Sequence, residues 1–298
     1  MLKYAADLKT LLYIVITSCL FAFLWYDGMS DQPIVALWSP LHILLYIWLL
    51  FMSVTVSVMA HNQMHVPIWK SRVLNVITEL WITCFYGFPV FAWIPTHNRN
   101  HHRYTNKEPD NTRTYRFSEE NNFWTIVTYP SISGSVQMWA IKEYLKERWK
   151  LNKQDFLYCM VQITVLVCWY ALFFYINWFF ALIYVVIAHQ VALYVVMFFN
   201  YIQHVHADEE SEYNHSRNIT GSLNFFLFNN GLHTAHHMNA NLHWSKLREA
   251  HSKIEAHIDP SLNEKSFWGY LLKAYILSVF IPKFKTKSLR LKRISTSS

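Results

Sequence analysis

Residues 33–65 read PIVALWSPLHILLYIWLLFMSVTVSVMAHNQMH, an apolar run that ends in His61 and His65. A helix that spans a bilayer needs about 20 apolar residues, so this run is longer than one span requires. Its last turns are therefore expected to extend beyond the hydrocarbon and to carry both histidines into the aqueous layer. Because residues four apart lie on one face of a helix, the two imidazoles can point at one metal ion.

Two further histidine clusters follow, each at the junction of an apolar and a polar segment. They are His97-Asn-Arg-Asn-His101-His102 and His233-Thr-Ala-His236-His237, and a ninth histidine, His204, lies between them. His101 and His102 are adjacent, so on a helix they point about 100° apart and can address two ions. Nine imidazoles exceed the needs of one metal ion and suit two, and a structural zinc site would close with four ligands. Ligation by nitrogen alone suits iron, copper, nickel and zinc alike.

The composition indicates a membrane protein. The 298 residues are 53% hydrophobic and only 15% charged, whereas soluble domains carry about 25% charged residues. Four stretches are suited to cross a bilayer, at about 8–26, 33–60, 156–176 and 178–201. A fifth apolar stretch, 73–95, is predicted to be interfacial or re-entrant, because two prolines weaken a full-length helix there.

The distribution of charge predicts the topology. The links between the paired spans carry no basic residue, whereas segments 96–155 and 202–298 hold most of the lysines and arginines. An excess of basic residues marks the cytoplasmic side, so both termini and all three histidine clusters are expected there. The expected fold is an all-α integral membrane protein with a single domain over 1–298. Four transmembrane helices in two hairpins would carry a cytosolic helical cap, and 267–281 would form a helix lying on the membrane surface.

Several classes of function are excluded by the motifs that the sequence lacks. The net charge is +7, but the basic residues that produce it lie mainly in segments that follow membrane spans. This distribution marks the cytoplasmic side, so a nucleic-acid partner is not expected. Neither GxGxxG nor GxxxxGK[ST] occurs, which argues against a nucleotide-binding fold. HExxH is absent, and the one Glu-x-x-His, from Glu212 to His215, does not match the paired motifs of soluble di-iron bundles. The four cysteines lack the CxxC spacing of zinc or iron–sulfur sites.

The set HxxxH, HxxxHH and HxxHH resembles the histidine boxes of the membrane fatty acid desaturase and hydroxylase superfamily. The segments 102–106, 200–208 and 230–237 look especially like those of bacterial acyl-lipid desaturases, and the resemblance extends over about 53–258. It implies a non-haem di-iron centre at the cytosolic helix ends, which activates O2 and abstracts hydrogen from an unactivated C–H bond. By position, the implied ligands are His61, His65, His97, His101, His102, His204, His233, His236 and His237.

Other residues are assigned less directly. The resemblance implies that Asn200, one helical turn before His204, contacts an iron through water. Carboxylates commonly orient ligating imidazoles, and Glu79, Asp110 and Asp208 are the candidates. His189 is a candidate for the substrate channel, and His206 is an alternative to His204 as a ligand. The remaining histidines His215, His243, His251 and His257 are expected at the surface.

The resemblance also implies partners. Each turnover needs two electrons, and with no redox motif in the chain they are expected from a separate ferredoxin or cytochrome b5-type donor. That donor would dock on basic residues of the cytosolic face, for which Lys142, Lys146, Arg148 and Lys150 are candidates. The substrate is expected to be a long-chain fatty acyl group or lipid that enters between helices, in a bacterial inner membrane or the endoplasmic reticulum.

Desaturation is the leading hypothesis, but it shares its hydrogen abstraction with hydroxylation. A di-iron hydroxylase or alkane-type monooxygenase is therefore the nearest alternative. A haem or zinc membrane protein that transfers electrons or binds a ligand is an alternative of another class.

Overall fold

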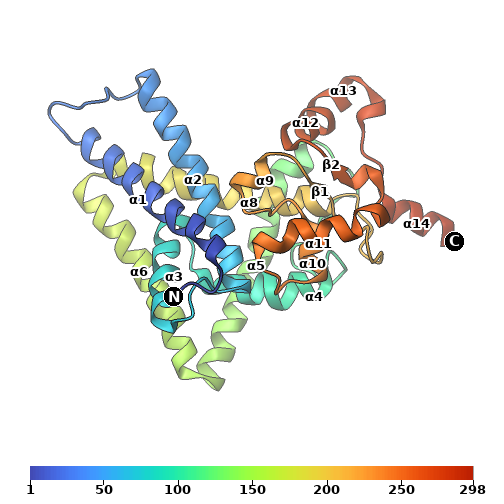
Figure 1. The fold of residues 1–298 in the computed structure, drawn as a ribbon, viewed down its shortest axis with the longest axis horizontal. Helices are drawn as coiled ribbons and strands as arrows, with labels where there is room; N and C mark the ends of the chain where they lie inside the picture. Colours follow the sequence, from blue (N-terminus) through green and yellow to red (C-terminus); the bar gives the residue numbers. More distant parts are fainter. Residues whose placement is uncertain (298) are drawn as a thin grey trace. The chain divides into compact units, whose positions relative to one another are not determined.

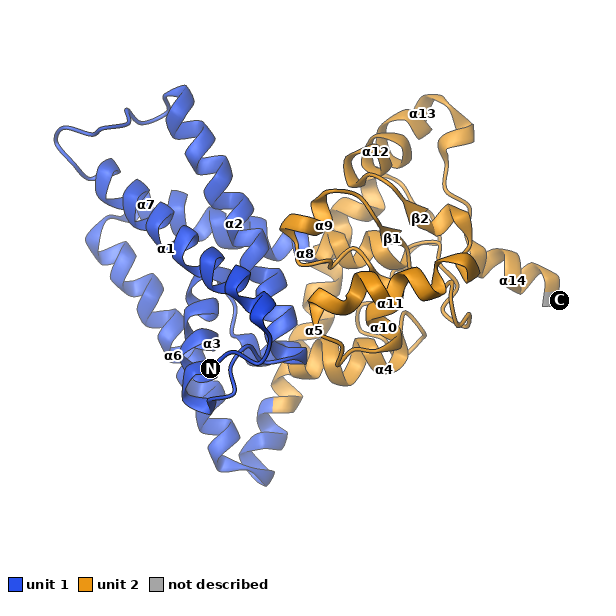
Figure 2. Cartoon of the chain, viewed as in Figure 1, with its two compact units in different colours: residues 1–93, 145–196 blue, residues 94–144, 197–298 orange. Residues whose placement is uncertain are grey.

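The computed structural model describes residues 1–297 and is mainly helical, in agreement with the predicted all-α class (Figure 1). The chain packs as two compact units (Figure 2). Unit 1 comprises residues 1–93 and 145–196, and unit 2 comprises residues 94–144 and 197–298. Each unit is thus built from two separate segments of the chain.

Unit 1 is built from long apolar helices. They are α1 (Leu8–Gly28), α2 (Pro40–His65), α3 (Arg72–Tyr86), α6 (Lys153–Ile176) and the start of α8 (Ala188–His204). The three-residue α7 (Trp178–Phe180) follows α6. Three short helices complete the unit: η1 (Ala5–Asp7), η2 (Val90–Ala92) and the π-helical η4 (Ala181–Ile187).

Four helical segments of the described chain are long and apolar enough to cross a membrane, which confirms the four predicted spans. They are Ala5–Gly28, Pro40–His65, Lys153–Ile176 and Trp178–His204. Only 22% of the apolar window in Lys153–Ile176 is buried within the protein. Lipid can cover the exposed apolar side chains of such a helix. Its backbone polar groups are satisfied by hydrogen bonds within the helix, so it is stable in a bilayer.

The second span begins later than its composition suggests, since α2 starts at Pro40 rather than at residue 33. Ser39 caps the helix by accepting a hydrogen bond from the backbone N–H of His42. Pro40 fits the first turn, where a missing N–H costs nothing. The residues before the cap form a loop, in which the backbone N–H groups of Ile34 and Val35 donate to the carboxylate of Asp27 on α1. The helix then continues to His65, so one rigid element carries the first histidine cluster.

The predicted interfacial or re-entrant stretch, 73–95, is interrupted in the structure. Helix α3 ends at Tyr86. The next residue, Gly87, caps it with a φ of 78° in the left-handed region, and the short η2 follows Pro89. Within α3, Glu79 is buried but paired: it accepts hydrogen bonds from Gln63 at 2.9 Å and from Tyr158 at 2.5 Å. These bonds compensate the cost of burying a carboxyl group among apolar helices.

Gly87→Ala should destabilise unit 1. An added Cβ at residue 87 would lie 2.3 Å from Cγ of His189, in a backbone conformation that alanine rarely adopts. We expect a lower melting temperature in detergent micelles, measured by circular dichroism. Gly134→Ala is the matched control, because a Cβ there meets no described atom within 4 Å. That helical substitution should be neutral or stabilising by up to about 1 kcal/mol, and equal melting temperatures for the two variants would contradict the prediction.

Unit 2 is built from shorter helices joined by loops. Its first segment holds the π-helical η3 (Ile94–His101), α4 (His102–Tyr104) and most of α5 (Phe123–Leu151). Its second segment holds the end of α8, then α9 (Leu223–Phe226), α10 (His233–Met238), α11 (Leu247–Ile254), α12 (Phe267–Leu271), α13 (Ser278–Phe280) and α14 (Leu289–Ser297). Two short strands, β1 (Asn218–Ile219) and β2 (Asn263–Glu264), pair in parallel, with Asn218 opposite Asn263.

The predicted surface helix over 267–281 corresponds to α12, the π-helical η8 (Leu272–Leu277) and α13. One side of this segment is buried and includes Phe267, Tyr270 and Tyr275. The other side exposes large apolar groups, among them Trp268, Val279 and Phe280. A helix with these two faces suits a position at a membrane surface.

Candidate metal centre

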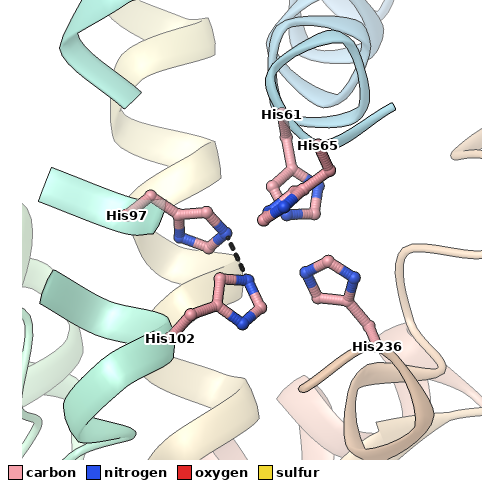
Figure 3. Close-up of side chains that lie close together, drawn as sticks. All are labelled: His61, His65, His97, His102 and His236. Atoms are coloured by element: carbon pink, nitrogen blue, oxygen red, sulfur yellow. Dashed lines mark hydrogen bonds between the residues drawn. The ribbon is translucent and has the colours of Figure 1, made fainter. Parts of the chain in front are cut away.

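The second histidine cluster lies on the π-helical turn η3 and the start of α4. In a regular α-helix, residues five apart would point about 140° away from each other. The wider π-helical turn, with its i→i+5 hydrogen bonds, brings such residues onto one side. Nε2 of His97 and Nε2 of His102 consequently lie 3.0 Å apart (Figure 3). The local backbone, rather than a long-range contact, thus pairs these two imidazoles.

Four buried or half-buried histidines form one group in unit 2. They are His101, His204, His233 and His237, each offering one nitrogen within 4.8 Å of the others. Nε2 of His233 lies 3.0 Å from Nε2 of His204 and 3.1 Å from Nε2 of His237. The group draws on η3, the end of α8 and both ends of the first turn of α10.

Three other histidines of unit 2 form a second group. Ring nitrogens of His97, His102 and His236 also lie within 4.8 Å of one another, and the three rings converge (Figure 3). In unit 1, His61 and His65 project from the end of α2 one turn apart, with ring centroids separated by 4.8 Å (Figure 3). The helical spacing therefore does bring this pair onto one face, as predicted.

The geometry of these groups fits metal ligands. Two nitrogens bound to one ion at about 2.1 Å and at right angles are about 3.0 Å apart, close to the observed spacings. Nε2 of His101 is buried and accepts no hydrogen bond from the described residues. Burial, followed by the neighbouring histidines, lowers the pKa of His237 well below its ordinary value. A neutral imidazole keeps the lone pair that a metal needs.

A buried carboxylate orients one of these imidazoles. Oδ2 of Asp110 lies 2.7 Å from Nδ1 of His101, and the carboxylate also accepts hydrogen bonds from Asn106 and Thr112. Burial alone would raise the pKa of Asp110, but the interactions with His101 and Thr112 outweigh burial and lower this pKa well below its usual range. The ionised carboxylate thus holds a proton on Nδ1 and leaves Nε2 of His101 to face the group. Carboxylates that orient metal-binding imidazoles in this way are common.

Comparison with known proteins identifies the family. The sequence model of fatty acid desaturases matches residues 36–269, which is most of the chain. The protein belongs to the fatty acid desaturase family. This confirms the resemblance found in the histidine clusters, whereas no match was found among curated proteins. Membership indicates a multi-pass membrane oxidoreductase of the desaturase and hydroxylase type, which uses a di-iron centre and O2 to oxidise lipid.

In this member of the family, His204 is positioned by segment 215–217, whose role was not predicted from the sequence. Nδ1 of His204 lies 3.0 Å from the carbonyl oxygen of His215. Two residues later, the fully buried Arg217 donates from Nη1 to the carbonyls of Ile202 and Val205, on either side of His204. Arg217 therefore caps the end of α8 with a positive charge, where the helix dipole favours one. No sequence signal distinguishes Arg217 from the surface arginines around it.

Arg217→Met should destabilise unit 2. The substitution removes a charged donor from two buried carbonyl groups, at a cost of about 2–4 kcal/mol. We expect a clear fall in the melting temperature of the purified protein. Lys253→Met serves as the control, because Lys253 is exposed and forms only a surface ion pair with Glu249. A similar change in both variants would show that the buried cap contributes little.

The other predicted residues lie in different surroundings. Asn200 donates from Nδ2 to Oη of Tyr129 at 2.6 Å, close to the loop that holds Asp110. Asp208, a candidate for orienting a ligand, instead pairs with Arg293 at 2.7 Å and so holds α14. His189 is buried, with Nδ1 2.7 Å from Oη of Tyr170. Glu79 has the partners described above rather than a histidine.

The expectation for the remaining histidines was largely wrong. His215, His243 and His251 are buried, and only His257 is exposed. His206, the alternative to His204, instead contacts the carbonyl of Glu119 and the hydroxyl of Thr286. Spacing along the chain could not reveal this burial, because these polar segments belong to unit 2 and become buried only when its loops fold.

Proposed function

We propose that the protein desaturates a long-chain fatty acyl substrate at a non-haem di-iron centre. In this reaction a –CH2–CH2– unit, O2, two electrons and two protons become –CH=CH– and two molecules of water. The observation that carries the proposal is the pair of histidine groups in unit 2, whose spacing suits two metal ions. Bound iron would supply the O2 chemistry that removes hydrogen from an unactivated C–H bond.

We assign the ligands by combining the two histidine groups with the family motifs. One iron would be held by the group His101, His204, His233 and His237, and the other by His97, His102 and His236. The HxxxH motif at the end of α2 adds His61 and His65 to the ligand set, and Asn200 would contact an iron through water. His101 has a defined role beyond ligation, since its Nδ1 proton is held by Asp110 while Nε2 binds.

We further propose that the centre faces the cytosol, where a separate ferredoxin or cytochrome b5-type protein delivers the electrons. The excess of basic residues in 96–155 and 202–298 supports this orientation. Of the basic residues suggested for donor docking, Arg148 already pairs with Glu147 and Asp155, so Lys142 and Lys150 are the better candidates. His189 could border the path of the acyl chain, although its ring nitrogen is engaged by Tyr170.

The test combines lipid and metal analysis. The chain would be expressed in a host together with a ferredoxin or cytochrome b5 donor, and total fatty acids would be profiled by gas chromatography–mass spectrometry. We expect new double bonds and about two irons per purified chain. Hydroxylated products labelled from 18O2 would instead assign the protein to the hydroxylase branch. A Soret band, or zinc in place of iron, would overturn the di-iron proposal.

A further inference from the structure

A hollow in unit 2 has the lining of an anion site. It encloses about 340 Å³, part of which is open to solvent, between the loop 113–118 and the first turns of α5. Two arginines and several hydroxyl groups line it, including Arg113, Arg116, Ser118, Thr128 and Ser133. No acidic side chain is among its lining residues. Guanidinium and hydroxyl groups together are the usual donors to phosphate oxygens.

The two guanidinium groups retain unused donors. Nε of Arg113 and Nε of Arg116 are both buried and have no hydrogen-bond partner among the described residues. Burial lowers the pKa of Arg116, and the like charge of Arg113 lowers it further. Arg113 also pairs with Glu108 at 3.4 Å, but that carboxylate is largely exposed to solvent. These Nε atoms are closed off from solvent in this structure, so an anion in the hollow would be bound through the other guanidinium N–H groups and the hydroxyl groups of the lining.

The rim of the hollow is apolar and aromatic. Phe117, which lines the hollow, is 73% exposed, and Ile132 adds a second apolar side chain to the lining. Exposed aromatic side chains beside arginines are typical of sites that meet both a lipid chain and its charged head. The lining therefore suits an amphiphile better than a free inorganic anion.

Hydrogen bonds connect this hollow to the metal centre. Tyr129, one of its lining residues, donates to the carbonyl of Thr112 at 2.5 Å and accepts from Asn200. Arg116 donates to the carbonyl of Asp110 at 2.9 Å, and Asp110 orients His101. A head group bound between the arginines would thus lie against the loop that sets one of the metal ligands.

We propose that the hollow between Arg113 and Arg116 binds the phosphate group of a lipid-like substrate. The phosphate would accept hydrogen bonds from both guanidinium groups and anchor the acyl chain at the metal-bearing unit. This assignment rests on the proposed function, because it places the head of the oxidised lipid. Two sources share the chemistry: the phosphates of an acyl-coenzyme A and the phosphodiester of a phospholipid.

The test measures binding without turnover, on the iron-loaded protein in phosphate-free maltoside detergent. Its probes are palmitoyl-coenzyme A, dioctanoyl phosphatidylglycerol and free palmitate, and its variants are Arg113→Gln and the double variant Arg113→Gln/Arg116→Gln. We expect the double variant to bind one phosphate-bearing probe at least 10-fold more weakly and palmitate equally well. The affected probe identifies the source of the phosphate. Arg248→Gln/Lys253→Gln on α11 removes two charges away from the hollow and should bind all probes as the wild type does.

Two readouts keep the outcomes separate. Iron content and melting temperature show whether the double variant folds. If it does not fold, Arg113→Gln alone should still lower the affinity for the same probe about 3-fold or more. Equal affinity of folded variants and wild type for both phosphate-bearing probes would overturn the inference, even if wild type desaturates lipid. Conversely, the wild type could form no lipid product while the variants still lose phosphate binding. That result would overturn the proposed function and not the phosphate site.

Discussion

His101→Ala or His236→Ala should lower turnover by more than about 100-fold and reduce the iron bound per chain. The reason is that each imidazole belongs to a different histidine group, so each substitution removes one ligand from one proposed ion. Membrane insertion should be unchanged, because neither residue lies in an apolar span. The measurement is the rate of product formation by gas chromatography–mass spectrometry, with iron determined on the same purified sample.

His257→Ala is the matched control for these two variants. His257 is exposed and stacks on Tyr213, and it belongs to neither histidine group. Its replacement should leave turnover and iron content unchanged. His251 would be a poorer control, because it is buried and its replacement would leave a space in unit 2. Wild-type turnover in His101→Ala or His236→Ala would overturn the ligand assignment.

Asp110→Asn should weaken iron binding by about 10- to 100-fold and lower turnover accordingly. An amide cannot stabilise the proton on Nδ1 of His101 as a carboxylate does, so the tautomer with Nε2 ready to bind loses its preference. The backbone N–H of Asn106 donates to Oδ2 and that of Thr112 to Oδ1, so the single oxygen of an amide can keep only one of these two hydrogen bonds. The measurement is the iron retained after dialysis against graded concentrations of a chelator.

Asp208→Asn separates a metal effect from a general loss of charge. Asp208 is buried less deeply and pairs with Arg293, so its substitution should loosen α14 without changing iron affinity. Melting temperatures of both variants show how much each depends on folding. The same iron affinity in Asp110→Asn and in wild type would mean that the His101 tautomer is set by Thr112 or by the metal itself.

The sequence alone was sufficient for features that depend on local periodicity and composition. Apolar length predicted four spans, and the structure has four segments of that kind. His61 and His65 are four residues apart, which predicted that they share one face of α2, because residues four apart lie on the same side of a helix. The three histidine motifs as a set were specific enough to predict the family, which the match over residues 36–269 confirms.

Only the tertiary structure decided how the histidines divide into groups and which polar residues hold them. Adjacent His101 and His102 belong to different groups, and His101 joins His204 and His233 from distant segments. Asp110 and Asp208 were equivalent candidates in the sequence, yet one contacts a histidine and the other an arginine. Whether a pairing spans nine residues, as from His101 to Asp110, or many more, as from Asp208 to Arg293, it depends on how loops close and on which buried polar groups need partners. A residue such as Arg217 is recognisable only once the helix end that it caps lies in place.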